Sequence, residues 1–459
     1  MIIMKTMFKK ARTKRVLFLT NFLVFAMLAS APGRLNAQQR DEPVRLDLQG
    51  AIEMAREKNP SLQVAALGIE RADLAIDAVR GGFLPSLNAQ ASYNRNIKKP
   101  VIFLPPGSPF GDVLEIGSDN SYSAVFAASV PVYNPALNAQ LQTARAEREL
   151  AGEQYRASQI ELEYFVQSAF FDVLLARESM EVMQQSYSHA KDNLEQTRKM
   201  HRQGLVAEYD MIRATVQTEN LRPNVLQAEA GYDVALNYLK ALIGMSLLEE
   251  MIPQGDLSSL TEQMLGSFNI TEAPRSLQRN TDLTQLGLQI KLLGEQQRGV
   301  RASGLPSLSL AGNYNFQTEA NDFIFSDYNW VQMFSAGLRL NIPIFNGLTV
   351  RRQIQQLDIA GQQLKLQKEY MEDNLNVQLE NILRSMSIAV EKSVNARSTV
   401  EMADRGYRIA RTRYDTGQGT LLEVNDSELA LTQARFNLLQ AKHEILQAHT
   451  EYIKFIGQN

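Results

Sequence analysis

The sequence predicts an α+β chain made of two tandem copies of one unit, in which short amphipathic strands lead into very long helices. Three observations predict this fold class: motifs recur in the same order at a nearly constant separation, four segments alternate apolar and polar residues, and two segments keep an apolar heptad. The chain has 459 residues, of which 44% are hydrophobic and 21% are charged. This composition supplies a large core and excludes a disordered chain.

The first element is a secretory signal peptide, predicted over residues 1–37. A cluster of Lys and Arg precedes a largely apolar run at 16–29, which is too short to span a bilayer. We expect cleavage after Ala37, with cleavage at Ala29-Ser30-Ala31 and an uncleaved anchor as the alternatives. Removing residues 1–37 removes seven basic and no acidic residues, so the net charge goes from −3 to −10. An acidic exported chain argues against nucleic acid as a partner.

The two copies are aligned by five pairs of matching motifs. The Leu-Pro-Ser-Leu motif at 84–87 recurs at 305–308, an offset of 221 residues. The other pairs are 130–134 with 342–346, Gly204 with Gly417, 238–240 with 452–454, and Asn59 and Leu62 with Asn280 and Leu283. We expect repeat one over 38–244 and repeat two over 277–459. The segment 245–276 between them is expected to lie outside the helical wall.

Each copy contributes two amphipathic strands. They are predicted over 87–94, 121–132, 307–317 and 334–344. A period of two with one apolar face fits a half-buried sheet in a soluble protein or a strand that crosses a membrane. The loops 98–120 and 318–329 are flanked by aromatic residues, which fit an interfacial girdle or ordinary loop packing.

The junctions between elements carry turn and capping residues. Pro131 and Pro343 are predicted to end the second strand of each copy. Asn134 followed by Pro is typical of a helix N-terminus, and Asn346 is expected to cap the matching helix of repeat two. Glycines turn the chain between the long helices, at Gly204 and Gly417.

The helices are predicted over 135–203, 205–244, 277–304, 348–416 and 418–457. The two longest keep apolar heptads, which indicate left-handed coiled-coil packing. At the helical rise, the long helices would measure roughly 104 Å and the return helices about 60 Å. A return helix therefore cannot reach the strands, and the helix before each strand pair fills the remaining length. Each copy is predicted to be one long helix beside two shorter helices in series.

No enzyme chemistry, cofactor or metal site is predicted. The absence of Cys excludes disulfides and thiolate chemistry, and no Ser/His/Asp set or Gly-rich phosphate loop appears. Only four His are present, and they are scattered along the chain. We interpret His189 and His201 as solvated helix residues, and Met180 and Met183 as core residues.

In these features the chain, from about residue 45 to 457, resembles the TolC-type outer-membrane efflux proteins. The resemblance rests on the duplication, the Leu-Pro-Ser-Leu motifs, the junction prolines and the helix-turn segments 204–210 and 414–426. It implies a homotrimer in the lipid of a Gram-negative-type outer membrane, with a twelve-stranded β-barrel above a twelve-helix periplasmic α-barrel and an equatorial belt. Four strands cannot close a barrel alone, which agrees with an oligomer.

The resemblance also implies a function and residue roles. The function is a passive exit duct for efflux or secretion that docks to a periplasmic adaptor and an inner-membrane RND or ABC-type transporter. An acidic, cation-selective periplasmic gate carries over onto Glu423 and Asp426, and a tip latch onto Asp210 and Tyr414. The sequence departs from the family pattern at Gly419, where a basic residue is expected. Acidic residues in a first helical turn are also favoured by the helix dipole alone.

Two other functions are alternatives to the exit duct. One is a non-transport trimeric coiled-coil spacer or adhesin anchored in the outer membrane. The duplication argues against it, because a simple fibre needs neither matched hairpins nor antiparallel return helices. The other is a secreted enzyme, which lacks any supporting motif.

Overall fold

The computed structural model describes residues 43–458. The expected signal peptide and its cleavage site lie outside the described residues. The elements from Arg45 onward belong to one compact unit. Among the described residues, no helix combines the length and the apolar character that crossing a bilayer would require.

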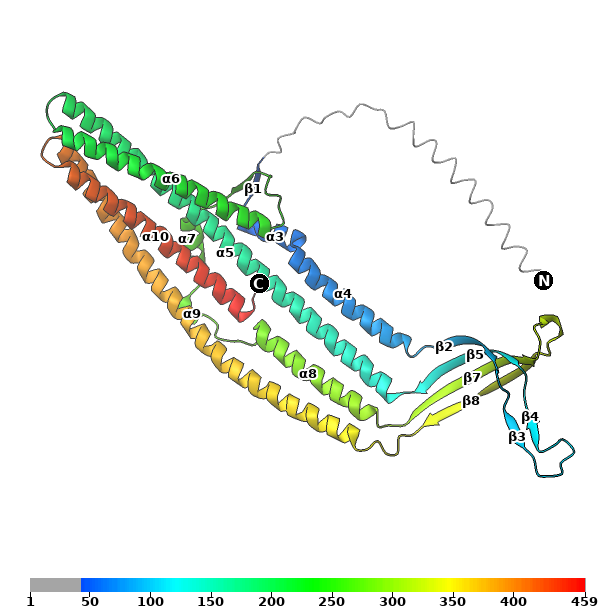
Figure 1. Ribbon diagram of the computed structural model, residues 1–459. Helices are drawn as coiled ribbons and strands as arrows, with labels where there is room; N and C mark the ends of the chain where they lie inside the picture. Colours follow the sequence, from blue (N-terminus) through cyan, green and yellow to red (C-terminus); the bar gives the residue numbers. More distant parts are fainter. Residues whose placement is uncertain (1–42, 459) are drawn as a thin grey trace, which may run out of the picture. The chain divides into compact units, whose positions relative to one another are not determined.

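Four antiparallel strands form the main sheet, in the order β2, β5, β7, β8 (Figure 1). Their bounds are β2 Ser86–Arg95, β5 Asn120–Tyr133, β7 Ser307–Ala320 and β8 Val331–Asn341. β2 pairs with β5, and β7 pairs with β8, so each predicted pair of strands is antiparallel within its own copy. The two copies meet where β5 pairs with β7.

The strand register gives the sheet one apolar and one polar face. Ala89, Phe126, Tyr314 and Phe334 stand opposite one another across the four strands. The adjacent row on the other face is Asn88, Ala127, Asn313 and Ser335. Because side chains alternate across a strand, each row represents one face. The predicted amphipathic strands are confirmed.

Two junction predictions need correction. β5 continues through Pro131 to Tyr133, with a register irregularity between these two residues, so Pro131 lies inside the strand rather than at its end. A proline lacks a backbone donor and is tolerated where the ladder is irregular. Pro343 does follow the end of β8. Asn346 does not cap the next helix with its side chain, because that helix begins after Leu348, which takes a left-handed conformation with φ 65°.

The helices follow the predicted pattern of one long helix beside two shorter ones, and repeat one adds a further short helix, α3. In repeat one they are α3 Leu48–Lys58, α4 Pro60–Gly81, α5 Pro135–Arg202 and α6 Glu208–Leu242. In repeat two they are α8 Thr281–Ala302, α9 Thr349–Asp415 and α10 Leu421–Ile456. Both α4 and α6 pack against α5, and both α8 and α10 pack against α9 (Figure 1). α5 also packs against α8 and α10, which joins the two copies.

The short helices meet end to end at two equivalent joints. Asn59 caps α4 by accepting from Ser61 N at 2.8 Å, and its side chain donates to Leu242 O, at the end of α6, at 2.8 Å. Asn280 repeats this arrangement between α8 and α10, because it caps α8 and donates to Phe455 O at 2.8 Å. Asn59 and Asn280, which match in sequence, therefore make the same cap and the same contact between short helices in both copies.

The heptad positions form the core of the helical wall. In α5, Val166 and Val173 are fully buried, and in α9 the same holds for Met386. Asn134 accepts from Leu137 N at 3.1 Å and caps α5, as its position before Pro135 predicts. The burial of these heptad positions and the cap at Asn134 agree with the sequence, and the left-handed supercoil stays a prediction.

Smaller elements occupy the connecting segments. Residues 245–276 contain β6 Met251–Pro253, α7 Leu257–Ser267 and the short 3₁₀ helix η1 Ile270–Glu272, and α7 packs against α10 and α5. The loop 98–120 contains a small hairpin, β3 Val101–Phe103 with β4 Val113–Glu115, that the sequence did not predict. A second 3₁₀ helix, η2 Phe325–Asp327, lies between β7 and β8, and β1 spans Val44–Leu46.

Candidate gate at the helical tip

Two glycine turns form the tip of the wall, at the end of the long helices away from the sheet (Figure 1). Gly204 lies between α5 and α6 with φ 74°, and Gly417 lies between α9 and α10 with φ 73°. This left-handed conformation is strained for residues with a Cβ, so glycine is the expected residue at both turns. Both glycines therefore lie where the chain reverses direction between two helices.

A small hydrophobic core holds the two helix pairs together at this tip. It is built from side chains of all four helices. Its buried members are Leu194, Met200, Ala214, Tyr407, Tyr414, Leu421, Val424 and Leu431. The tip of repeat one is therefore packed directly on the tip of repeat two within one chain.

Tyr414 lies in this core and has a hydrogen-bond partner that the sequence did not predict. Its hydroxyl lies 2.9 Å from Thr197 Oγ1, and Thr197 Oγ1 donates to Asn193 O at 2.8 Å. Since a hydroxyl carries one hydrogen, Tyr414 is the donor to Thr197. Burial raises the pKa of Tyr414, so the phenol stays protonated and can donate.

Asp210 lies near Tyr414 without bonding to it. The charge of Asp210 contributes to the raised pKa of the phenol, but within residues 43–458 the structure gives Tyr414 no hydrogen bond to this carboxylate. The expected direct latch between Asp210 and Tyr414 is thus absent in this structure. The reason is geometric: the single phenolic hydrogen is already directed to Thr197.

Glu423 caps its own helix. The Thr420 side chain accepts from Glu423 N at 3.2 Å, and Glu423 Oε2 accepts from Thr420 N at 3.3 Å, which completes a capping box. Asp426 follows three residues later and is exposed. Both carboxylates therefore remain accessible from the first turns of α10, although Glu423 also has the capping role that its position alone favours.

The surroundings of Gly419 explain why this position holds glycine instead of the expected basic residue. A Cβ at this position would lie 3.1 Å from Tyr414 N and 3.0 Å from Glu423 Oε2, so a side chain fits poorly. The positive charge at the turn comes instead from Arg413, whose guanidinium lies 3.9 Å from Glu423 and donates to Gln418 O at 3.1 Å. Arg413 was not among the predicted site residues, although it directly precedes Tyr414.

His189 corrects a second sequence interpretation. We expected a solvated side chain, but the imidazole stacks on the Tyr407 ring at 5.1 Å with an interplanar angle of 19°. Its side chain is only 26% exposed, and Nδ1 lies 3.9 Å from Glu428 on α10. The helical periodicity of α9 could have suggested this contact, because Tyr407 occupies a heptad position.

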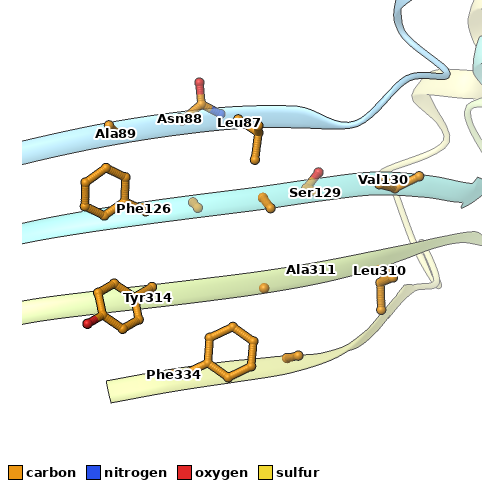
Figure 2. A pocket seen from close by; sticks show the side chains of 14 residues that line it. Leu87, Asn88, Ala89, Phe126, Ser129, Val130, Leu310, Ala311, Tyr314 and Phe334 are labelled. Atoms are coloured by element: carbon orange, nitrogen blue, oxygen red, sulfur yellow. The ribbon is translucent and has the colours of Figure 1, made fainter. Parts of the chain in front are cut away.

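At the other end of the wall, residues 43–458 leave the apolar face of the sheet uncovered. Figure 2 shows Phe126, Tyr314 and Phe334 on three neighbouring strands, with Leu87 and Leu310 beside them. The exposed fractions of Phe126 and Phe334 are 55% and 72%. A contiguous apolar surface of this kind marks contact with a membrane or a partner. The fold is therefore a sheet with one apolar face that the described residues leave uncovered, continued by a wall of paired long helices.

The chain belongs to the outer membrane efflux protein family, whose model matches residues 51–245 and 273–458. Among curated relatives, the outer membrane protein TolC of Vibrio cholerae is 25% identical over 404 residues, covering 84% of each chain. The cobalt-zinc-cadmium resistance protein CzcC of Cupriavidus metallidurans is 22% identical, over 70% of this chain and 73% of the relative.

Solved structures share the fold. The CusC channel superposes with a TM-score of 0.73 at 19% identity, covering 93% of this chain and 96% of that chain. The Campylobacter jejuni CmeC outer membrane channel gives a TM-score of 0.70 at 18% identity, covering 89% and 85%. The tandem-duplicated α+β fold is confirmed. With the family, these findings make the chain an outer-membrane exit duct for efflux or secretion.

Proposed function

We propose that three copies of this chain form a closed, passive duct that is gated at the helical tip and serves a tripartite efflux or secretion system. The observation that carries this proposal is that the main sheet has two unpaired edges. In the described sheet, β2 pairs only with β5, and β8 pairs only with β7. Open strand edges are not tolerated in lipid, so β2 of one copy would pair with β8 of the next.

The edges of the helical wall support the same closure. α9 exposes a stripe of apolar side chains that includes Ile388, Met402 and Ile409, spaced by multiples of seven residues. At the other edge, α6 exposes Ile212 and Val216. Such stripes are typical of coiled-coil seams without a partner. Three copies would bury them head to tail and form a ring of twelve helices below a ring of twelve strands.

The two faces of the sheet would then meet different surroundings. The apolar face would contact outer-membrane lipid, and the face with Asn88, Asn313 and Ser335 would line a water-filled lumen. A lumen of neutral polar groups does not select a cargo. Energy and selection would come from an inner-membrane RND or ABC-type transporter, joined to the duct by a periplasmic adaptor. Residues 245–276 would form the belt around the helical wall.

The tip would be the gate. Glu423 and Asp426 of three copies would place their carboxylates near one axis, where they attract cations. Asp210 and Tyr414 would act in the latch, with Thr197 as the bonded partner of Tyr414 in the packed state. Gly204 and Gly417 would allow the turns that let the helix pairs meet there.

The test is the single-channel conductance of the purified mature protein in a planar bilayer, with a trivalent cation added from the side of the helical tube. We expect small, cation-selective openings that the cation blocks. Glu423→Ala with Asp426→Ala should abolish the block. The matched control is Glu249→Ala with Glu250→Ala, which removes two exposed carboxylates from the loop after α6 and should leave the block intact.

Each outcome has a clear meaning. If the channel opens and the trivalent cation does not block it, the duct is supported and Glu423 and Asp426 are rejected as gate residues. If a bilayer-inserted trimer never conducts, even in the charge-removal variant, the duct fails and the spacer or adhesin function takes its place.

A further inference from the structure

Three helices meet at His189 in the half of the wall that leads to the tip. His189 belongs to α5, Tyr407 to α9 and Glu428 to α10, and we name these three residues the three-helix joint. The imidazole stacks on the Tyr407 ring at 5.1 Å, and its Nδ1 lies 3.9 Å from Glu428 Oε1. The joint therefore connects the long helix of repeat one, α5, with the long helix α9 and the return helix α10 of repeat two.

The joint is largely shielded from water. The side chains of His189 and Glu428 are 26% and 9% exposed, and Tyr407 is buried. Glu428 Oε1 accepts from Thr432 Oγ1 at 3.0 Å, so its carboxylate is held on α10. The distance of 3.9 Å is too long for a hydrogen bond to His189. The stacked ring thus makes its main contact with Tyr407 rather than with the carboxylate.

Charged groups of both signs face the imidazole. Glu428 and Arg435 approach from α10, Arg411 from α9 and Asp192 from α5 itself. Arg435 also donates to Gln185 on α5 at 2.8 Å, which adds a second link between α5 and α10. A proton on His189 would therefore meet two guanidinium groups as well as two carboxylates.

The balance of these effects disfavours the charged ring. Burial lowers the pKa of His189 below the ordinary value of 6.5; the Glu428 charge opposes this shift, and Arg435 and Arg411 add to it. A histidine with a lowered pKa binds fewer protons when it is packed than when it is exposed. The contribution of His189 to the packing is therefore complete above pH 6.5, and it is lost as the pH falls through the lowered pKa of the packed imidazole.

We propose that the three-helix joint is a proton-responsive clamp, in which neutral His189 holds α5 against α9 and α10 and acidification releases them. His189 is a positioning residue in this scheme, because it acts through the packing of the helices. The release of the helices does not depend on the proposed duct. Only its consequence does: if the tip is the gate of the duct, mild acid favours the open state.

The experiment measures the joint directly and uses the absence of Cys in the chain. Gln203→Cys and Gln418→Cys place spin labels on the exposed turns of the two helix pairs. Labelled chains are diluted with unlabelled chains so that most labelled trimers contain one pair. The label-to-label distance distribution is recorded from about pH 7.5 to about pH 5. We expect a longer and broader distribution in acid, with a midpoint below 6.5.

Two variants and one control separate a proton effect from a structural effect. His189→Gln keeps a neutral polar side chain and should make the distances independent of pH. Glu428→Gln removes the charge that raises the His189 pKa and should move the midpoint to lower pH. His449→Gln is the matched control, because His449 contacts Phe268 rather than the joint, and it should keep the wild-type response.

A wild-type response that persists in His189→Gln would overturn the proposal, as would distances that do not change with pH in the unmodified joint. Conductance recorded on the same samples separates this inference from the duct. If the label distances respond to pH and the conductance does not, the proton-responsive clamp is supported. The same result would show that the tip does not control conduction.

Discussion

At the scale of single residues, the helical tip shows which residues the sequence could identify and which contacts it could not predict. Tyr414 is singled out as a latch residue by the resemblance to the TolC-type proteins. Its partner Thr197 could not be identified in this way, because the two residues lie far apart in sequence and their contact depends on how α5 and α9 rotate about their axes. Gly419 could be noted as a departure, but only the packing around it gives the reason.

Tyr414→Phe tests the Thr197 contact. The change removes the phenolic donor, while Thr197 keeps its bond to Asn193 O, so the loss should be about 1 kcal/mol. If that energy holds the packed tip, the opening frequency of single channels should rise roughly fivefold. Tyr370→Phe is the matched control, because Tyr370 is exposed on the same helix. Equal behaviour of the two variants would show that the hydroxyl of Tyr414 has no part in the latch.

At the scale of elements, the periodicities predicted the four main strands and the long helices, but not α3, α7 or the hairpin of β3 and β4. An alternation of two and a heptad are local patterns, and the main strands and helices appear close to the expected positions. Capping was predictable only where the local geometry is regular. Asn134 caps α5 as expected, whereas Leu348, with φ 65°, moves the start of α9 beyond Asn346. A left-handed Leu has no sequence signal, because few residues other than glycine adopt this conformation.

Glycines at the end-to-end joints of the short helices give a graded test. A Cβ at Gly457 would lie 1.9 Å from Arg279 O, and one at Gly244 would lie 2.8 Å from Lys58 Cβ, both at left-handed φ. Gly231 in α6 has open space around it. We therefore expect the thermal unfolding midpoint to fall most for Gly457→Ala, less for Gly244→Ala, and hardly at all for Gly231→Ala. Equal midpoints for the three variants would show that the joints do not hold the helices together.

At the scale of the whole molecule, one chain is an incomplete structure. Among the described residues, the main sheet ends in two unpaired edges, and the helical wall exposes apolar stripes on α6 and α9. The sequence could predict this incompleteness, since four strands are too few to close. It could not predict which side chains of α6 and α9 stay exposed, because that depends on packing between helices far apart in sequence.

Disulfide cross-linking between copies tests the closure. With Gln90→Cys on β2 and Ser335→Cys on β8, oxidation in the membrane should give covalent dimers and trimers on a denaturing gel. Because β2 of one copy could pair with β8 of the next in several registers, neighbouring positions on β8 are each changed to Cys as well. The control pair is Val125→Cys and Asn315→Cys, which stand opposite each other within one chain and should give only monomers. Monomers throughout the scan would reject edge-to-edge closure.

The paired asparagine joints have a mechanical consequence. In each copy the backbone of the long helix is continuous, while its neighbours are interrupted where Asn59 meets Leu242 O and Asn280 meets Phe455 O. Tilting a short helix at such an interruption strains one side-chain hydrogen bond, whereas bending a continuous helix distorts its backbone ladder. Deformation at the tip should therefore be absorbed at these joints. The short helices next to the sheet, α4 and α8, would then be spared the tilting of α6 and α10, while the continuous α5 and α9 would remain the mechanical link between the tip and the sheet.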